Sequence, residues 1–258
     1  MRRLLPPWNV RLFVGLALMA VAAAGLVTGC QRQETPPAPS PDASTTGGDA
    51  QPTGVQPDAA TTTPPAPDAE GWESLFDGKT LGKWESSDFW KPGKVIVKDG
   101  CIVLETGTGD LTGVNWAGDA TMLPKVDYEI SLEAQRVDGG DFFCGLTFPY
   151  KGSCASLVVG GWGGGVVGIS SLDGFDASEN ETTNYKEFQN GKWYTVRLKI
   201  TDKKMEAWID GEQVVDAEVG ERSVDVRIEV EASKPLGIAA YNTKAALRNI
   251  RMRRLLDE

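Results

Sequence analysis

Hydrophobic and polar residues alternate with a period of two along much of the second half of the chain. Alternation of this kind is typical of β-strands that turn one face to a core and the other to water. The clearest apolar positions are Val126, Tyr128, Ile130, Leu132 and Ala134; Phe142, Cys144, Leu146 and Phe148; and Val224, Val226, Ile228 and Val230. The sequence has no long amphipathic helical pattern, so it predicts an all-β domain of many short strands.

Turn signals separate the predicted strands at short intervals. Asp-Gly pairs occur at Asp77-Gly78, Asp99-Gly100, Asp138-Gly139, Asp173-Gly174 and Asp210-Gly211. Such pairs favour tight hairpin turns. Many short strands joined by turns of this type indicate an antiparallel β-sandwich or barrel.

One hairpin can be predicted residue by residue. With a loop at residues 201–204, the facing pairs are Ile200 with Met205, Leu198 with Ala207, Val196 with Ile209, Lys199 with Glu206, and Arg197 with Trp208. The first three pairs form an apolar face, and the last two form an ion pair and a cation–π contact worth about 0.5–1 kcal/mol each. Trp208 is then either a platform for a sugar ring or a surface residue covered by Arg197.

The first 29 residues have the three parts of a secretory signal. A basic segment with Arg2, Arg3 and Arg11 precedes an apolar run over residues 12–27, and small residues lead to Cys30. This arrangement resembles a bacterial lipoprotein signal, which implies cleavage before Cys30, acylation of its thiol and new amino group, and attachment to a lipid membrane of the cell envelope. The alternative is a transmembrane anchor, for which the run is slightly short of the roughly 20 residues required.

Residues 30–69 are predicted to form a disordered tether. Nine of the 15 prolines lie there, and Val55 is the only large apolar residue, so the segment has no core to offset its ordering entropy. In some bacterial lipoproteins an Asp directly after the acylated Cys retains the protein in the inner membrane. Here this position is Gln31, which favours attachment to the outer membrane. Residues 70–258 hold most of the aromatic residues and are long enough for one substantial core.

Composition excludes several kinds of chemistry. The chain has no His, so a Ser-His-Asp or Cys-His nucleophile and a His-ligated zinc or iron site are ruled out. Its net charge of −10 argues against a nucleic-acid partner, because nucleic-acid binding relies on Lys and Arg side chains that neutralise the phosphates. Any catalytic chemistry must therefore use carboxylates, Tyr, Lys, Cys or a metal ion with oxygen ligands.

The densest polar segment, residues 173–182, is the acidic loop of the sequence. Its carboxylates are suited either to acid–base chemistry or to an oxygen-ligated Ca²⁺ ion, and the competing interpretation is a solvated loop without a site. The sequence indicates no other cofactor. A glycine-rich segment at residues 160–165 surrounds Trp162, which lies either in the core or in a ligand groove.

The cysteines allow one disulfide in an oxidising envelope. Cys144 and Cys154 are the natural pair, provided that the hairpin loop between them has an odd number of residues. A four-residue loop at residues 149–152 would instead place Cys144 opposite Leu157. The alternative is two buried thiols.

Six motifs, in order, resemble the 3-keto-disaccharide hydrolase domain family. They are GWESLFDGKTL at residues 71–81 with Trp84, VIVKDGCI at 95–102, DYEI at 127–130, NGKWY at 190–194, WIDG at 208–211 and LRNIR at 247–251. The resemblance covers nearly all of residues 70–258 and implies a concanavalin A-like β-sandwich. It also implies hydrolysis of glycosides oxidised at C3, where the ketone acidifies the neighbouring C–H and a carboxylate is a sufficient base.

The sequence departs from the family in the glycine-rich segment, so the site residues are hypotheses. With no His available, the base is expected to be Asp176 or Glu179. The expected saccharide-binding residues are Asp173, Asn180, Glu181, Trp162, Trp208 and Arg197. A non-catalytic carbohydrate-binding module and a structural interaction domain, both of the same fold, remain alternatives.

Overall fold

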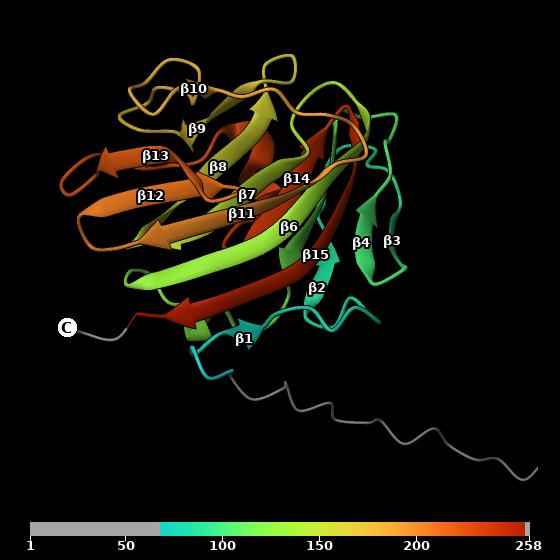
Figure 1. The fold of residues 1–258 in the computed structure, drawn as a ribbon, viewed down its shortest axis with the longest axis horizontal. Coiled ribbons are helices and arrows are strands. Elements are labelled where there is room, and N and C mark those ends of the chain that lie inside the picture. The colour runs from blue at the N-terminus through green and yellow to red at the C-terminus, as the bar shows by residue number, and fades with distance from the viewer. Residues whose placement is uncertain (1–67, 256–258) are drawn as a thin grey trace, which may run out of the picture. The chain divides into compact units, whose positions relative to one another are not determined.

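Two antiparallel sheets packed face to face form the part of the protein that the computed structural model describes, residues 68–255 (Figure 1). One of them, sheet A, has its strands in the order β13 (Glu212–Glu218), β12 (Lys204–Ile209), β11 (Trp193–Ile200), β6 (Tyr128–Gly139), β15 (Thr243–Arg254), β4 (Cys101–Leu104) and β3 (Val95–Lys98), and β1 (Glu73–Ser74) pairs with β15.

Sheet B completes the sandwich. Its order is β10 (Asn184–Tyr185), β9 (Val166–Ser170), β8 (Ser153–Gly161), β7 (Cys144–Tyr150), β14 (Gly237–Tyr241), β5 (Leu111–Trp116) and β2 (Trp84–Ser86). Two short 3₁₀ helices, η1 (Ala120–Met122) and η2 (Ile228–Ser233), lie in the connections. The predicted concanavalin A-like β-sandwich is confirmed.

The period-two pattern places the core between the sheets. The alternate residues of β6 that the sequence predicts to be apolar, from Tyr128 to Ala134, are at most 1% exposed. They pack with Leu146 and Phe148 of β7 and Leu157 of β8 in one hydrophobic cluster. Tyr128 places its hydroxyl in this core because it donates a 2.5 Å hydrogen bond to the carbonyl of Pro149.

The hairpin of β11 and β12 has the predicted register. All five facing pairs, from Val196 with Ile209 to Ile200 with Met205, are as expected. Lys199 forms its ion pair with Glu206 at 3.9 Å, and the Arg197 guanidinium lies 4.0 Å from the centroid of the Trp208 ring. Trp208 is therefore covered by Arg197, as one of the two interpretations has it.

Two predicted strand positions are wrong. Residues 224–230 are not a strand: Val224 and Val226 are buried, but the chain then enters η2, and Ile228 is 86% exposed. Phe142 does not share the inward face of Cys144, because the chain bends before β7 and Phe143 enters the main core instead. Phe142 packs on the outer side of sheet B, near Val158 and Tyr241.

The predicted disulfide between Cys144 and Cys154 is also not formed. The hairpin of β7 and β8 pairs Tyr150 with Ser153, which leaves only two residues in the turn. This register places Cys144 opposite Val159 and Cys154 opposite Pro149, so the two thiols are far apart along the hairpin. Both are free and buried, as is Cys101.

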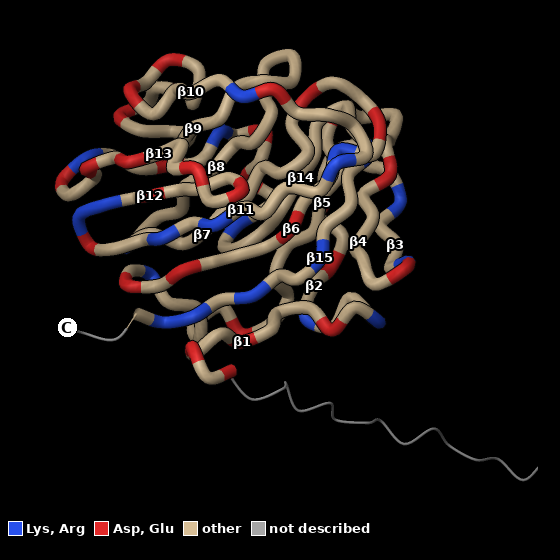
Figure 2. The backbone as a smooth tube through the Cα atoms, in the orientation of Figure 1, with Lys and Arg blue, Asp and Glu red and all other residues tan. Residues whose placement is uncertain are grey.

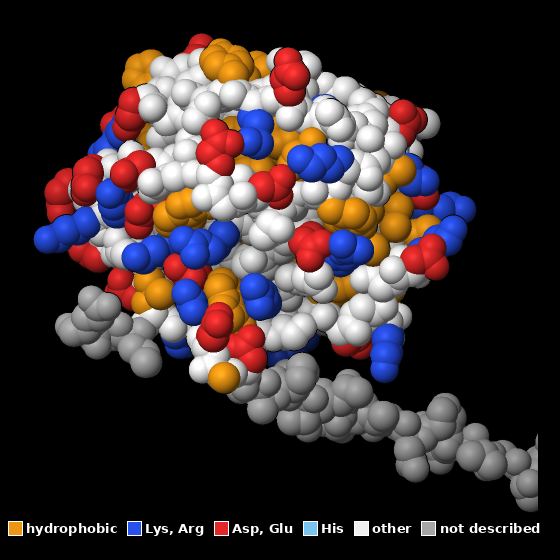
Figure 3. Space-filling model, in the orientation of Figure 1, with side chains coloured by type: hydrophobic (Ala, Val, Ile, Leu, Met, Phe, Trp, Pro, Cys, Tyr) orange, Lys and Arg blue, Asp and Glu red, His pale blue; other side chains and the backbone are white. Residues whose placement is uncertain are grey.

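Lys, Arg, Asp and Glu residues are distributed along the strands and loops of both sheets (Figure 2). On the outer face of sheet A, Lys and Arg side chains gather over β11, β6 and β15, with hydrophobic side chains between them (Figure 3). Within residues 68–255, no helix is long and apolar enough to cross a membrane. The predicted signal, the tether over residues 30–69 except its last two residues, and Cys30 lie outside the described residues.

Candidate functional site

A groove of about 490 Å³ lies on the outer face of sheet B. Its floor includes Gly145 of β7, Ser156 and Val158 of β8, and Tyr241 of β14. These residues alternate with the inward-facing core positions of the same strands, so the pleat of the sheet turns them outward. We call this feature the sheet B groove.

Aromatic side chains form one end of the sheet B groove. Trp162 lines it and is 43% exposed, so this residue does not lie in the core. The rings of Phe142 and Tyr241 also line it and lie 5.7 Å apart at an interplanar angle of 32°. Flat rings of this kind offer apolar surface to the faces of sugar rings.

The turn that carries Trp162 depends on glycine. Gly163 and Gly164 have φ angles of 86° and 109°, which side chains with a Cβ rarely adopt. A Cβ on Gly164 would also lie 2.8 Å from the carbonyl oxygen of Gly140. The glycine-rich segment therefore forms a tight turn between β8 and β9 that holds Trp162 at the rim of the groove.

A buried arginine of sheet A donates a hydrogen bond to this turn. Arg136 of β6 is 6% exposed, and its Nη1 lies 3.4 Å from the carbonyl oxygens of both Gly164 and Asp141. Its Nη2 donates to the carbonyl of Phe188 at 2.6 Å, and its Nε donates to Asn190 at 2.8 Å. Arg136 thus connects the Trp162 turn and the segment before β7 to the loop before β11.

Arg227 lies just before η2 and brings a positive charge to the lining of the groove. Its Nε and Nη2 donate to the carboxylate of Glu229 at 3.2 and 2.9 Å, and its Nη1 forms an ion pair with Asp176. The hydrogen bonds to Glu229 raise the pKa of Arg227, and the same bonds lower the pKa of Glu229. Glu229 is thereby kept ionised and is a weak base.

Two further carboxylates line the groove. Asp141 accepts hydrogen bonds from the backbone N–H groups of Phe142 at 2.7 Å and Gly163 at 2.9 Å, so it fixes the Trp162 turn. Asp110, the residue before β5, is exposed and accepts one long hydrogen bond of 3.5 Å from the side chain of Asn242. Asp110 is the lining carboxylate with the fewest contacts to other described residues.

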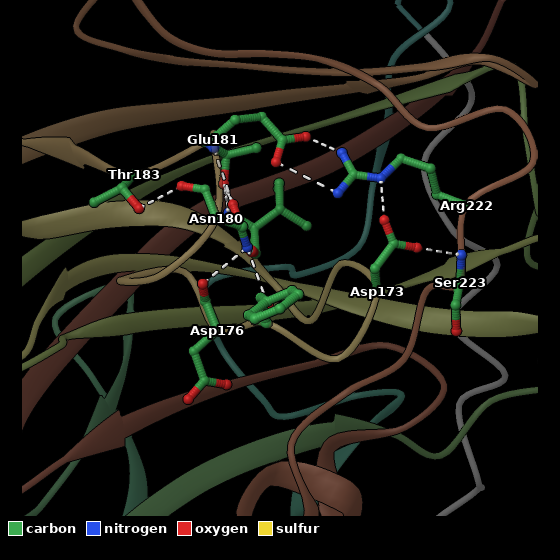
Figure 4. A network of polar contacts seen from close by, with 10 residues as sticks. Asp173, Asp176, Asn180, Glu181, Thr183, Arg222 and Ser223 are labelled. Carbon is green, nitrogen blue, oxygen red and sulfur yellow. Dashed lines mark hydrogen bonds and ion pairs between the residues drawn. The ribbon is translucent and has the colours of Figure 1, made fainter. Parts of the chain in front are cut away.

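The structure divides the predicted acidic loop into two parts. Asp173 and Glu181 both pair with Arg222, and Figure 4 shows their carboxylates directed toward its guanidinium. The hydrogen bond from Arg222, followed by the one from the backbone N–H of Ser223, lowers the pKa of Asp173. This pair and its arginine do not line the sheet B groove.

Asp176 lies next to the sheet B groove. Its carboxylate points away from the Arg222 cluster (Figure 4) and contacts two lining residues, Ser170 at 3.4 Å and Arg227. Asn180 uses its amide to hold the loop, donating to the carbonyls of Ile169 and Asp176 at 2.8 Å. Glu179 is exposed and is not among the lining residues.

The remaining predicted site residues are not brought together with the groove. Trp208 and Arg197 lie on sheet A, whereas Trp162 lies at the β8–β9 turn of sheet B. Sequence reasoning did not find Asp110, Asp141, Arg227 or Tyr241. Arg227 could have been noticed as a polar position in the apolar alternation of residues 224–230, but the pattern gave no reason to place it in the same groove as Trp162.

The described residues offer no evident metal centre. Among residues 68–255, no group of three or more Cys, Asp or Glu residues is arranged to hold a metal ion. Of the groove carboxylates, Glu229 is engaged by Arg227 and Asp141 by backbone N–H groups. The Ca²⁺ ion stays a prediction of the sequence alone.

Comparisons with known proteins place the chain in a family. The model of the 3-keto-alpha-glucoside-1,2-lyase-like domain matches residues 71–253. The match spans nearly all of the described sandwich, and the class of protein is thus a carbohydrate-related β-sandwich domain. The chain belongs to the 3-keto-alpha-glucoside-1,2-lyase-like domain family.

Other relatives are more distant. The FR901469 synthetase of Dothideomycetidae sp. (strain 11243) is 28% identical over 145 residues, which are 52% of this chain and 1% of that protein. The carbohydrate-binding module CBM66 from Bacillus subtilis is 12% identical, with a TM-score of 0.44 over 66% of this chain and 95% of that one. Domain 4 of the arabinanase AbnA from Geobacillus stearothermophilus, solved with arabinotriose, is 12% identical, with a TM-score of 0.46 over 71% of this chain and 91% of that one.

Proposed function

We propose that the sheet B groove binds a saccharide and that the domain cleaves glycosides whose sugar is oxidised at C3. Family membership supports the reaction class. The observation that carries the proposal is the composition of the groove, which joins the exposed ring of Trp162, the guanidinium of Arg227 and the carboxylate of Asp110. Aromatic surface with a few polar groups is typical of a small-molecule site.

The chemistry requires a base and a stabilised oxyanion. A ketone at C3 acidifies the C2–H bond, so a base that takes this proton leaves an enolate with its charge on the C3 oxygen. The electrons then form a C1=C2 double bond and expel the glycosidic oxygen from C1, which is protonated as it leaves. Addition of water to the double bond completes the hydrolysis.

We assign the two roles by the contacts of each side chain. Arg227 is held charged at the groove wall, so its guanidinium is suited to bind the C3 oxygen as negative charge develops there. Asp110 is the lining carboxylate with one long contact, which leaves it available to take the C2 proton. Asp176 contacts Arg227 and would act through it by holding the guanidinium in position.

The test is turnover of a 3-keto-glycoside by the purified protein. Asp110→Asn removes the base and keeps the shape, so turnover should fall by about 10²–10⁴-fold. Asp99→Asn is the matched control: Asp99 lies in the β3–β4 turn of sheet A with φ of 52°, a conformation that Asn also tolerates. Equal turnover in Asp110→Asn and the parent would remove Asp110 as the base.

A non-catalytic carbohydrate-binding module is the second candidate. The observation that favours it is that Glu229 and Asp141 are already engaged by Arg227 and by backbone N–H groups, while the Trp162 ring remains open. This function predicts saccharide binding without turnover in the parent. Trp162→Ala should then weaken binding by about 0.5–2 kcal/mol, measured by calorimetry against Trp208→Ala on the other sheet.

We also propose that the mature protein is attached to a lipid membrane of the bacterial envelope through acylated Cys30, with the outer membrane favoured. The support is the signal-like sequence of residues 1–29 and the small residues before Cys30. Cys30→Ser should abolish acylation and leave an uncleaved precursor, because the thiol is the acceptor. Acyl chains on the mutant in mass spectrometry would exclude this attachment.

A further inference from the structure

Trp90 is a strongly exposed aromatic residue next to the sheet B groove. It is 71% exposed, although the ammonium group of Lys91 lies 4.6 Å from the centroid of its ring. The residue before it, Phe89, is only 8% exposed and packs with Leu111 and Tyr241, which line the groove. The chain therefore turns Phe89 inward and leaves the Trp90 ring in solvent beside the groove.

Close backbone packing fixes Trp90 next to Asp110. A Cβ on Gly109 would lie 1.8 Å from the carbonyl oxygen of Trp90 and 3.1 Å from Cε3 of its ring, so this approach requires glycine. The N–H of Gly109 also donates to the carbonyl of Lys91 at 2.9 Å. Asp110 follows Gly109 directly and lines the groove. The Trp90 ring is thus held against the residue that precedes the carboxylate proposed as the base.

The sheet B groove is longer than a single sugar unit. Its lining extends from Ser170 of β9 to Leu111 of β5, across β8, β7 and β14. Neighbouring strands lie about 4.8 Å apart, so the distance from β9 to β5 is about 19 Å. One sugar ring occupies only part of this length.

Two exposed tryptophans flank this length. Trp162 lies in the turn between β8 and β9, whereas Trp90 packs beside the start of β5. Trp90 is not among the lining residues, so a short saccharide bound at Trp162 does not reach it. Indole rings provide large flat apolar surfaces. A saccharide of several units can therefore contact both rings at once.

We propose that the sheet B groove binds an oligosaccharide longer than a disaccharide, with Trp90 as the platform for a unit beyond Asp110. This inference rests on the proposed function, which supplies the saccharide and its cleavage in this groove. The family model describes an α-glucoside lyase-like domain, so an α-linked glucose chain is the ligand to test. Trp90 contacts a distant unit and not the reacting sugar, so it should govern affinity for long chains and leave the chemical step unchanged.

The first experiment titrates the purified protein with maltose and with maltotetraose by calorimetry. We expect the parent to bind maltotetraose about three- to tenfold more tightly than maltose, which is the effect of one additional stacked ring. Trp90→Ala should remove this preference and leave the affinity for maltose at the parent value. Trp90→Phe, which keeps a flat ring, should retain most of the preference.

Trp208→Ala is the matched control. It removes a tryptophan that also carries a cation over its ring, but from sheet A. We expect the parent preference for maltotetraose, with thermal unfolding showing that every variant is folded. Equal affinity of the parent for the two chains, binding of neither, or a preference that survives in Trp90→Ala would overturn the Trp90 platform.

Turnover separates this inference from the proposed cleavage. The substrates are maltose and maltotetraose oxidised at C3 of the non-reducing terminal glucose. Trp90→Ala should raise KM for the longer substrate by about three- to tenfold and leave kcat unchanged, as expected for lost uniform binding. A parent that prefers maltotetraose through Trp90 but cleaves neither substrate would refute the cleavage and leave the platform standing. A parent that cleaves both substrates with equal KM would refute the platform and leave the cleavage standing.

Discussion

The Nη2 of Arg136 donates a 2.6 Å hydrogen bond to the carbonyl oxygen of Phe188. This contact joins β6 of sheet A to the loop before β11, while the Nη1 of the same side chain reaches the carbonyl of Gly164 in the Trp162 turn. The Arg136 guanidinium also lies 5.7 Å from the centroid of the Phe143 ring. One buried cation therefore connects the end of sheet A to the rim of the sheet B groove.

Arg136→Met should lower the free energy of unfolding by about 2–4 kcal/mol. Methionine fills much of the volume, but the carbonyls of Phe188 and Gly164 lose their donor, and each buried acceptor left without a partner costs about 1–3 kcal/mol. Urea denaturation measures the change. In the control Arg254→Met, the lost hydrogen bond to the carbonyl of Met122 is exposed, so stability should stay within about 0.5 kcal/mol of the parent. A cost below about 1 kcal/mol for Arg136→Met would contradict this structural role.

The sequence was most informative where one face of a strand is buried. In the hairpin of β11 and β12, a slip by one residue would move Leu198 and Ile200 into water, so the apolar pattern determines the register. The alternation of apolar and polar residues also predicted which residues of β6, from Tyr128 to Ala134, face the core. Charge pairs on the outer face, such as Lys199 with Glu206, then followed from the register without further information.

The candidate site was harder to predict because it is built from a segment that the pattern misassigned. Residues 224–230 alternate like a strand, yet they belong to neither sheet: Val224 enters the main core, whereas Val230 packs with Phe142 and Tyr241 on the outer side of sheet B. There its polar residues Arg227 and Glu229 form the wall of the groove. Asp110 and Trp162 reach the same groove from distant turns, and no single-sequence pattern reports that proximity.

The three cysteines of the sandwich should be unreactive in the folded protein. Burial raises the pKa of the Cys144 thiol to about 12, and burial also raises those of Cys101 and Cys154. At pH 8 the thiolate fraction is therefore very small, and iodoacetamide should modify these residues slowly until the protein is unfolded. Mass spectrometry after digestion without reductant should also detect no peptide linking Cys144 to Cys154. Such a peptide would contradict the register of β7 and β8.

Stability should fall as the pH is lowered below about 5, partly through Glu133. Burial alone would raise the pKa of this carboxyl, but hydrogen bonds from Arg248 and Asn249 outweigh burial and hold the pKa below its ordinary value of 4.5. A pKa that is lower in the folded state adds stability above the unfolded value, and this stability is lost as the pH falls through the folded value.

Glu133→Gln isolates this contribution. At pH 7 the variant should be less stable than the parent by about 0.5–1 kcal/mol, as for a half-exposed ion pair. The difference should shrink as the pH falls through the folded pKa of Glu133, because the parent carboxyl then becomes protonated too. Urea denaturation of both proteins between pH 7 and pH 3 provides the comparison. A difference that stays constant over this range would mean that Glu133 is not a source of the pH dependence.

The acidic loop provides the sharpest test of where the base lies. The sequence favours Asp176 or Glu179, whereas the groove contains Asp110, and Asp176 touches it through Ser170 and Arg227. On a 3-keto-glycoside, Asp176→Asn should lower turnover by about tenfold, because Arg227 loses one of its two carboxylate partners but keeps Glu229. Glu179→Gln should remain close to the parent, because Glu179 does not line the groove.

Comparison of these two variants with Asp110→Asn under the same conditions ranks the three carboxylates. We expect the loss of about 10²–10⁴-fold that a general base contributes only in Asp110→Asn. If Asp176→Asn has the largest effect, the loop carries the base, and Arg227 is then the ion-pair partner that orients its carboxylate. If Glu179→Gln has the largest effect, the substrate must extend from the groove onto the exposed surface of the acidic loop. Circular dichroism of each variant shows whether the sandwich is intact, since none of the three side chains belongs to the core.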